Sequence, residues 1–197
     1  MTHRRTRCAV AAALLVLGLS AGCSSGRPPV PAEPSVSVPP IPGVGMSGAG
    51  RFRADPCAAV TVEQLTALGF TGGERSRDGN RCVTTFGAVA KVSTSNLGDS
   101  LQILYQEHAL GHDTGNHWEP ITVETIYPAV IVAIDENVPS KQADGPRGCT
   151  LALAADNSTL VHISAATADQ PEAGPWQHDP CGAAQKIAAL AVANLTA

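Results

Sequence analysis

The sequence predicts an α+β domain in which an antiparallel sheet is covered on one face by helices and linked by two disulfides. Three observations lead to this fold class. Strand-like segments outnumber helical ones and are joined by short turns, which is typical of antiparallel sheets. Four cysteines fall within residues 55–197. The Ala-rich C-terminal segment repeats its apolar residues with the period of a helix that packs on a sheet.

One helix and two strands are expected in the first part of the domain. Thr61 and Gln64 have the spacing of a capping box, so a helix should span residues 62–68 and end at the glycine that follows. Strand-forming residues predict strands over residues 82–86 and 88–94. A glycine between these two strands indicates a short turn.

A second helix is expected next. Asp99 followed by Gln102 predicts its start, and Gly111 predicts its end. Its apolar side chains recur at helical spacing and form one stripe: Leu101, Leu104, Tyr105 and His108. This helix is therefore amphipathic.

The second half of the domain reads as four strands and one long helix. Apolar runs and alternation predict strands over residues 121–126, 129–134, 150–154 and 160–166. The last helix is expected over residues 180–195, where Asp precedes Pro at the start and alanine and leucine share one face.

The N-terminus has the layout of a secretory signal peptide. Three arginines precede an apolar run over residues 8–19, and small residues precede Cys23. A cysteine directly after Ala-Gly resembles the lipobox of bacterial lipoproteins, whose cysteine receives a diacylglyceryl group and becomes the new N-terminus. We therefore expect residues 1–22 to be a lipoprotein signal peptide and Cys23 to be lipidated. A plain signal peptide with a chance cysteine is the alternative.

The membrane is thus an expected partner, reached through lipid. The apolar run is too short for a transmembrane helix, which needs roughly 20 residues, and acyl chains provide the anchor instead. Arg4-Arg5 suggests twin-arginine export, but the residues after the pair lack the apolar position of that signal, so the general secretory route is favoured. The expected location is the outer face of the cell membrane.

Residues 23–54 read as a lipidated cysteine followed by a disordered linker, and residues 55–197 as the globular domain. Residues 24–50 contain seven prolines, five glycines and five serines, a composition that cannot bury enough apolar surface to fold. Residues 55–197 contain seven basic and sixteen acidic side chains, a net charge of −9. We therefore expect no nucleic acid as a partner, because duplex binding requires a basic face.

The four domain cysteines are expected to form two disulfides, as is usual for an even number in an exported protein. Sequence position alone allows three pairings. Cys57 and Cys181 each lie in an Asp-Pro-Cys tripeptide at a helix start, whereas Cys82 and Cys149 lie in strand-like runs. The simplest pattern joins a helix start to its neighbouring strand twice, as Cys57–Cys82 and Cys149–Cys181. Zinc binding is the alternative, but no pair has Cys-x-x-Cys spacing.

These features occur together in one known family. With a lipobox, a Pro- and Ser-rich spacer, two Asp-Pro-Cys helix starts and two strand cysteines, the chain resembles the actinobacterial lipoproteins grouped as domain-of-unknown-function family 3558. The resemblance extends from about Cys23 to the C-terminus. Many members have an aromatic residue soon after the second cysteine, where this chain has Phe86 four residues on. The resemblance implies an envelope location and a two-disulfide fold, and it brings no assigned reaction.

The side chains that carry chemistry form no recognisable catalytic or metal-binding motif, so no catalytic residue, metal or cofactor is expected. His108 and His112 have the spacing of helical metal ligands, but Gly111 interrupts the helix between them. No Gly-x-Ser-x-Gly elbow is present. Trp118 and Trp176 lie beside prolines and are the candidates to line a ligand groove. Closing the end of the core is the alternative role for both.

The function expected from the sequence is that of a non-enzymatic, lipid-anchored envelope lipoprotein that binds an envelope protein or a small ligand. An extracytoplasmic hydrolase-type enzyme is one alternative, and a structural envelope component is another. A deep cleft with converging polar side chains favours the enzyme, and an open groove at a tryptophan favours binding.

Overall fold

The computed structural model describes residues 35–43, 45–112, 117–135, 147–168 and 171–197. Its helices and strands, in chain order, are α1 (Ala49–Ala54), the 3-10 helix η1 (Pro56–Ala59), α2 (Val62–Ala67), β1 (Gly73–Asp78), β2 (Arg81–Phe86), β3 (Ala90–Ser95), α3 (Leu101–Ala109), β4 (Glu119–Val123), β5 (Tyr127–Asp135), β6 (Arg147–Asp156), β7 (Thr159–Thr167), the 3-10 segment η2 (Pro171–Trp176) and α4 (Pro180–Thr196). The predicted signal peptide and Cys23 lie outside the described residues.

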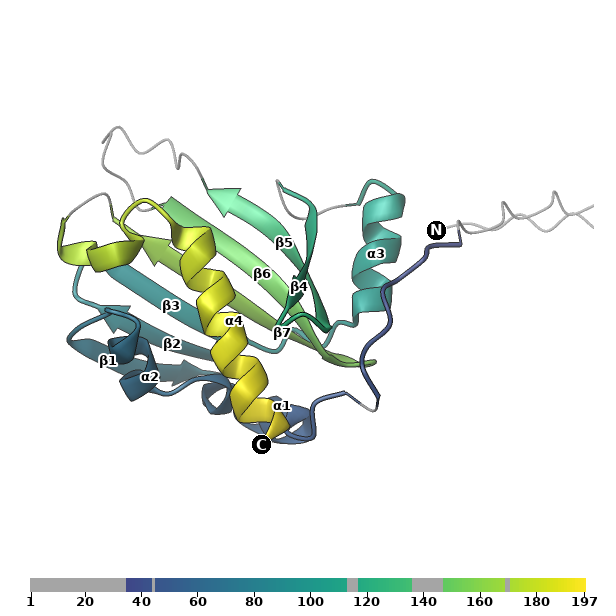
Figure 1. The fold of residues 1–197 in the computed structure, drawn as a ribbon, viewed down its shortest axis with the longest axis horizontal. Helices are drawn as coiled ribbons and strands as arrows, with labels where there is room; N and C mark the ends of the chain where they lie inside the picture. Colours follow the sequence, from purple (N-terminus) through teal and green to yellow (C-terminus); the bar gives the residue numbers. More distant parts are fainter. Residues whose placement is uncertain (1–34, 44, 113–116, 136–146, 169–170) are drawn as a thin grey trace, which may run out of the picture. The chain divides into compact units, whose positions relative to one another are not determined.

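The predicted fold class is confirmed. All seven strands form one sheet in the order β1-β2-β3-β7-β6-β5-β4, and every neighbouring pair is antiparallel. The first three strands form one meander and the last four form a second. β7 pairs with β3 on one side and β6 on the other, so the two meanders meet at the centre of the sheet (Figure 1).

One face of the sheet is covered by α4, which crosses β6 and β7 (Figure 1). Asp179 caps this helix by accepting a hydrogen bond from the Gly182 amide at 2.7 Å, and Pro180 occupies the first turn. Val161 and Ile163 of β7 belong to the fully buried cluster that packs on the helix. Four of the eight buried residues of α4 are alanine, whose small side chain lets the helix lie close to the sheet.

The opposite face carries α3, and a second, smaller apolar cluster lies beneath it. Leu101 of α3 packs there with Val130 and Leu160, which alternate along their strands with the residues facing α4. Leu104 and Tyr105 pack against the same cluster. The predicted apolar stripe is therefore the packed face of α3. The sheet is covered on both faces at this end, whereas the sequence predicted helices on one face only.

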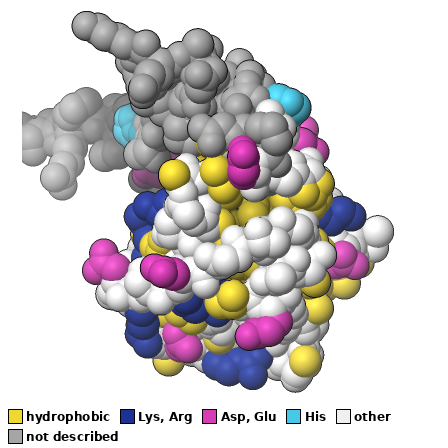
Figure 2. Space-filling model, turned by 90° about the vertical axis from the view of Figure 1, so that its left-hand side faces the viewer, with side chains coloured by type: hydrophobic (Ala, Val, Ile, Leu, Met, Phe, Trp, Pro, Cys, Tyr) yellow, Lys and Arg dark blue, Asp and Glu magenta, His cyan; other side chains and the backbone are white. Residues whose placement is uncertain are grey.

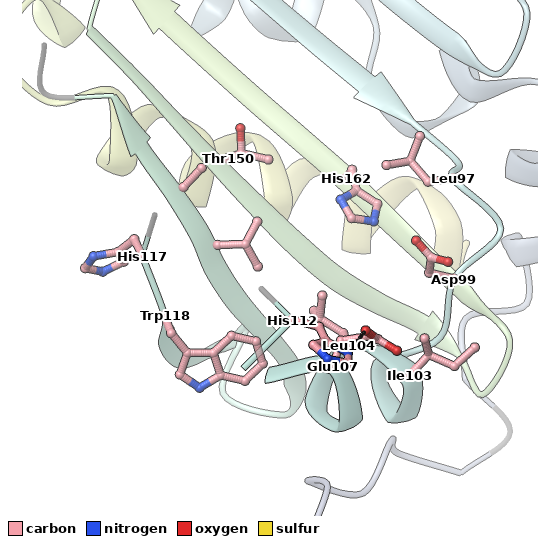
Figure 3. A pocket seen from close by; sticks show the side chains of 12 residues that line it. Leu97, Asp99, Ile103, Leu104, Glu107, His112, His117, Trp118, Thr150 and His162 are labelled. Carbon is pink, nitrogen blue, oxygen red and sulfur yellow. Dashed lines mark ion pairs between the residues drawn. The ribbon is translucent and has the colours of Figure 1, made fainter. Parts of the chain in front are cut away.

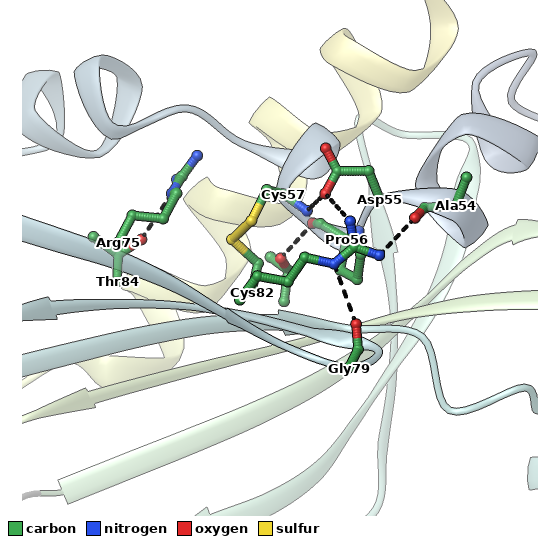
Figure 4. The surroundings of a disulfide bond; sticks show 10 residues. Ala54, Asp55, Pro56, Cys57, Arg75, Gly79, Cys82 and Thr84 are labelled. Atoms are coloured by element: carbon green, nitrogen blue, oxygen red, sulfur yellow. Dashed lines mark hydrogen bonds and ion pairs between the residues drawn. A yellow bond between two sulfur atoms is a disulfide. The ribbon is translucent and has the colours of Figure 1, made fainter.

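Both predicted disulfides are present, Cys57–Cys82 and Cys149–Cys181. Each joins the start of a helix to a strand, as the repeated tripeptide indicated. Figure 4 shows how the first is held: the carboxylate of Asp55 accepts from the Cys57 amide at 3.1 Å and pairs with Arg77 at 3.6 Å. Thr94 donates to the Pro56 carbonyl at 2.8 Å. These contacts fix η1 against β2 and β3.

The globular part begins earlier than the predicted boundary at residue 55, so the assignment of residues 46–54 to the disordered linker was wrong. The compact unit that contains the domain starts at Pro34. Met46 and Phe52 belong to the main core, and Phe52 is 0% exposed. Gly48 donates its amide to the Leu195 carbonyl at 2.7 Å, and a Cβ at Gly48 would lie 2.9 Å from Leu195. The glycine serves close packing against α4 rather than chain flexibility.

Two further elements differ from the predictions. β1 was not expected, because its sequence Gly-Glu-Arg-Ser-Arg-Asp contains no apolar alternation. It is an edge strand held through its backbone pairing with β2, and charged side chains are typical of exposed edges. The strand predicted over residues 121–126 ends instead at Val123, since Glu124 (φ 49°) and Thr125 (φ 63°) form a turn with left-handed backbone.

Among the described residues on the end of the molecule seen in Figure 2, Lys and Arg do not gather into one basic patch. Lys and Arg side chains there lie interspersed with Asp and Glu among neutral residues. Among the described residues, no helix is both long and apolar enough to cross a membrane.

Candidate functional site

The candidate site is a pocket between α3 and the face of the sheet opposite α4, here called the α3 pocket. Its volume is about 530 Å³, within the range of roughly 300–1,000 Å³ of small-molecule sites. The described lining residues come from the loop before α3, from α3, from the segment before β4 and from β5, β6 and β7: Leu97, Asp99, Ile103, Leu104, Glu107, His112, His117, Trp118, Val132, Ala133, Thr150 and His162 (Figure 3).

Trp118 forms part of the apolar wall of the pocket and is held by two aromatic contacts. The ring of Tyr105 meets it edge-on, with centroids 5.0 Å apart, and the ring of His108 stacks on it at 3.8 Å and an interplanar angle of 4°. Both partners lie on the apolar stripe of α3. The helix therefore fixes the position of the tryptophan that borders the cavity.

Asp99 lines the pocket because α3 begins one residue later than the sequence predicted. Ser100, not Asp99, caps the helix, and its hydroxyl accepts from the Ile103 amide at 3.3 Å. The carboxylate of Asp99 is thereby left for another role. It lies on the side of the pocket near His162 (Figure 3).

His162 provides the buried polar group of the pocket. It lies on β7, is 9% exposed, and its Nε2 atom is buried without a hydrogen-bond partner among the described residues. Burial lowers the pKa of this histidine below its ordinary value, and the nearby charge of Asp99 opposes that effect only in part. The ring is therefore neutral at neutral pH, with one nitrogen able to accept a hydrogen bond.

The rim of the pocket combines two histidine–carboxylate contacts with exposed apolar side chains. His112 lies 3.3 Å from the carboxylate of Glu107, and His117 lies 3.2 Å from that of Glu119. Leu97 and Ile103 are 50% and 46% exposed. Water-facing apolar side chains around a cavity that also holds a buried polar atom are typical of ligand-binding surfaces.

The buried neutral His162 makes the stability of the fold depend on pH. Its folded-state pKa lies below the ordinary value of 6.5. Between these two values the unfolded chain binds a proton that the folded chain does not bind, so the free energy of unfolding falls as the pH decreases through this window. Above the ordinary pKa this group has no effect on the pH dependence.

We therefore expect the wild type to lose more stability than His162→Gln when the pH is lowered from about 7.5 to about 5. Urea unfolding at several pH values measures this difference. Carboxylates titrate in both proteins and cancel in the comparison. Parallel pH profiles for the two proteins would show that His162 is not held in its neutral form.

The structure separates the two tryptophans that the sequence singled out. Trp118 borders the α3 pocket, whereas Trp176 lies on the other side of the sheet. Its indole nitrogen donates to the Leu68 carbonyl at 2.7 Å, and its ring packs against the main core. Trp176 also borders a smaller pocket of about 260 Å³ between β4 and α4. Its contacts are those of a residue that closes the core.

The histidines considered as metal ligands are each engaged otherwise. His108 stacks on Trp118, and His112 faces Glu107. Across the described part of the chain, no group of three or more His, Cys, Asp or Glu side chains is arranged to hold a metal ion.

Sequence reasoning missed Asp99 and His162 as site residues. The sequence pattern places Asp99 at the helix start, and it places His162 within the strand predicted over residues 160–166 without marking it as a site residue. The available signal was a histidine within a mostly apolar strand, at a position that alternation places on a buried face. Only the packing of α3 over this position turns it into a pocket residue.

The fold and the pocket define an α+β domain with two disulfides and an open pocket between a helix and the second face of the sheet. The family model described as "Protein of unknown function (DUF3558)" matches residues 18–194. The chain therefore belongs to this family, as the resemblance indicated. No curated protein and no solved structure matches the chain.

Proposed function

We propose that this protein is a lipid-anchored extracytoplasmic binding module that takes a small ligand in the α3 pocket. The observation that carries the binding role is the combination of an apolar cavity with the buried, unpartnered Nε2 of His162. A buried polar atom without a partner destabilises the free protein, and a ligand that supplies the missing hydrogen bond recovers that free energy.

The anchoring part of the proposal rests on the sequence. The basic start, the apolar run and the small residues before Cys23 together form a lipobox-like signal. The two disulfides support export, because disulfides persist in oxidising compartments. The protein acts at the outer face of the cell membrane, joined to it through acyl chains.

Binding is favoured over hydrolysis by the arrangement of hydroxyl groups near His162. Ser164 and Thr150 are bonded to each other, with 2.8 Å between their oxygens. Nucleophilic catalysis requires a hydroxyl that donates to the histidine base, and Nε2 of His162 has no partner. A purely structural role does not require a ligand-sized cavity such as the α3 pocket.

Changing Cys23→Ala should release the protein from the membrane or leave it unprocessed. The reason is that the cysteine thiol is the group that receives the diacylglyceryl anchor in the proposed lipobox. Fractionation of cells that express the variant, with immunoblotting for size, measures both outcomes. Processed variant protein found in the membrane fraction at the wild-type level would contradict the anchor.

Ligand entry into the α3 pocket should be visible in the fluorescence of Trp118. The Trp176→Phe variant contains Trp118 as its single tryptophan, and the Trp118→Phe variant contains only Trp176. Adding 2-phenylethanol, an apolar probe with one hydroxyl, should change the emission of the first variant saturably and leave the second unchanged. Equal responses of the two variants, or no saturation, would contradict binding at the α3 pocket.

A further inference from the structure

The charges of the α3 pocket are one-sided. Among its described lining residues, Asp99 and Glu107 are acidic, and none is Lys or Arg. Glu107 is engaged at the rim by His112 at 3.3 Å. No hydrogen bond or ion pair joins Asp99 to another described residue, and its carboxylate lines the pocket (Figure 3).

In the tautomer of His162 that carries its proton on Nδ1, Asp99 and His162 together present two hydrogen-bond acceptors to one region of the pocket. Figure 3 shows the carboxylate of Asp99 on the same side as the ring of His162, and the two groups are close enough for the charge of Asp99 to act on the ring. With its proton on Nδ1, the neutral ring accepts at Nε2. A group that fits this pair must donate at least two hydrogen bonds and is favoured by a positive charge.

The remaining walls select for an apolar body. Leu104, Val132 and Ala133 line the cavity together with Trp118. These side chains offer hydrophobic contact, and an aromatic ring also attracts a nearby cation. The cavity volume of about 530 Å³ suits one small molecule and not a folded segment of protein.

We propose that the ligand of the α3 pocket is a small amphipathic amine, whose ammonium group donates to the carboxylate of Asp99 and to Nε2 of His162 while its apolar body lies against Trp118. This inference rests on the proposed function, since it specifies the chemistry of that same site. An anion would instead face the carboxylate of Asp99, with no Lys or Arg among the described lining residues to balance it, and a purely apolar molecule would leave Nε2 unpartnered.

Three probes of similar shape test the ligand chemistry: 2-phenylethylamine, 2-phenylethanol and 3-phenylpropionate. Titration calorimetry uses the whole mature chain with Cys23→Ser, so that no detergent is needed. The amine should bind about tenfold or more tightly than the alcohol, because its charge strengthens the hydrogen bond to Asp99. The carboxylate probe should bind more weakly than the alcohol.

Two matched variants assign the preference to Asp99. Asp99→Asn keeps the size of the side chain and should reduce the preference for the amine over the alcohol to about threefold or less. Glu172→Gln makes the same change in net charge at an exposed position in η2 and should leave the preference intact. Melting curves establish that both variants are folded before the titrations are compared.

The outcomes separate this inference from the proposed function. If the alcohol or the carboxylate probe binds saturably and as tightly as the amine, the amine specificity is wrong and the binding role of the pocket stands. An equal loss of preference in both variants overturns the assignment to Asp99. If none of the three probes binds, both the inference and the small-ligand function are wrong.

Discussion

Removing both disulfides should leave most of the protein unfolded at 37 °C. The two bridges join cysteines that are 25 and 32 positions apart in the sequence. Loops of this length each contribute about 3.5 kcal/mol to the stability in the chain-entropy model. Their sum of about 7 kcal/mol is comparable with the whole stability of a typical domain, roughly 5–15 kcal/mol. Both bridges hold a helix start on the sheet, so the native contacts of η1 and α4 weaken together.

Pairwise replacement by alanine is the suitable test, because single replacements leave a reactive thiol. Cys57→Ala/Cys82→Ala and Cys149→Ala/Cys181→Ala should each lower the free energy of unfolding by about 3.5 kcal/mol, and the fourfold variant should show a broad, weak transition. Urea unfolding followed by circular dichroism measures the three variants. A fourfold variant that unfolds at the wild-type midpoint would contradict the role of the bridges.

Phe52→Ala should destabilise the protein by about 3–5 kcal/mol, the usual cost of truncating a fully buried phenylalanine. Phe52 is 0% exposed and lies within the main core. Its helix α1 is tied to the end of α4 through the amide of Gly48 and the Leu195 carbonyl. The substitution should therefore lower the stability of the whole core and not only that of the N-terminal segment.

Gly50→Ala is the matched change in the same helix. Gly50 is exposed, and the nearest atom to an added Cβ is the end of the Arg53 side chain at 3.7 Å. Because alanine favours the helix, this variant should gain up to about 0.5 kcal/mol. If residues 49–54 were a disordered linker, neither substitution would change the urea midpoint by a measurable amount.

Most regular elements and the disulfide pairing could be predicted because their signals are local. The capping box of Thr61 and Gln64 is formed as expected, with the Thr61 hydroxyl accepting at 3.2 Å and the Gln64 amide oxygen at 2.8 Å. The repeated Asp-Pro-Cys placed two cysteines at helix starts. Apolar runs identified the interior strands, although their bounds shifted by a few residues.

The parts that could not be predicted depend on contacts between distant segments. The glycines around residue 48 read as a linker, since composition does not reveal that α4 lies against them. β1 is stabilised by pairing with its neighbour rather than by burial of its own side chains. The α3 pocket arises only when Asp99, Trp118 and His162 are brought together by the packing of α3 on the sheet.

A map of where a small ligand binds is the most direct test of the α3 pocket as the ligand site. A ¹⁵N–¹H correlation spectrum of the mature chain with Cys23→Ser, titrated with 2-phenylethylamine, reports on every assigned amide at once. Saturable shifts are expected at α3, at Trp118 and along β5 to β7 around His162, with little change around Trp176 and α4. Shifts centred on the pocket between β4 and α4, or no saturable shifts at all, would contradict the α3 pocket as the ligand site.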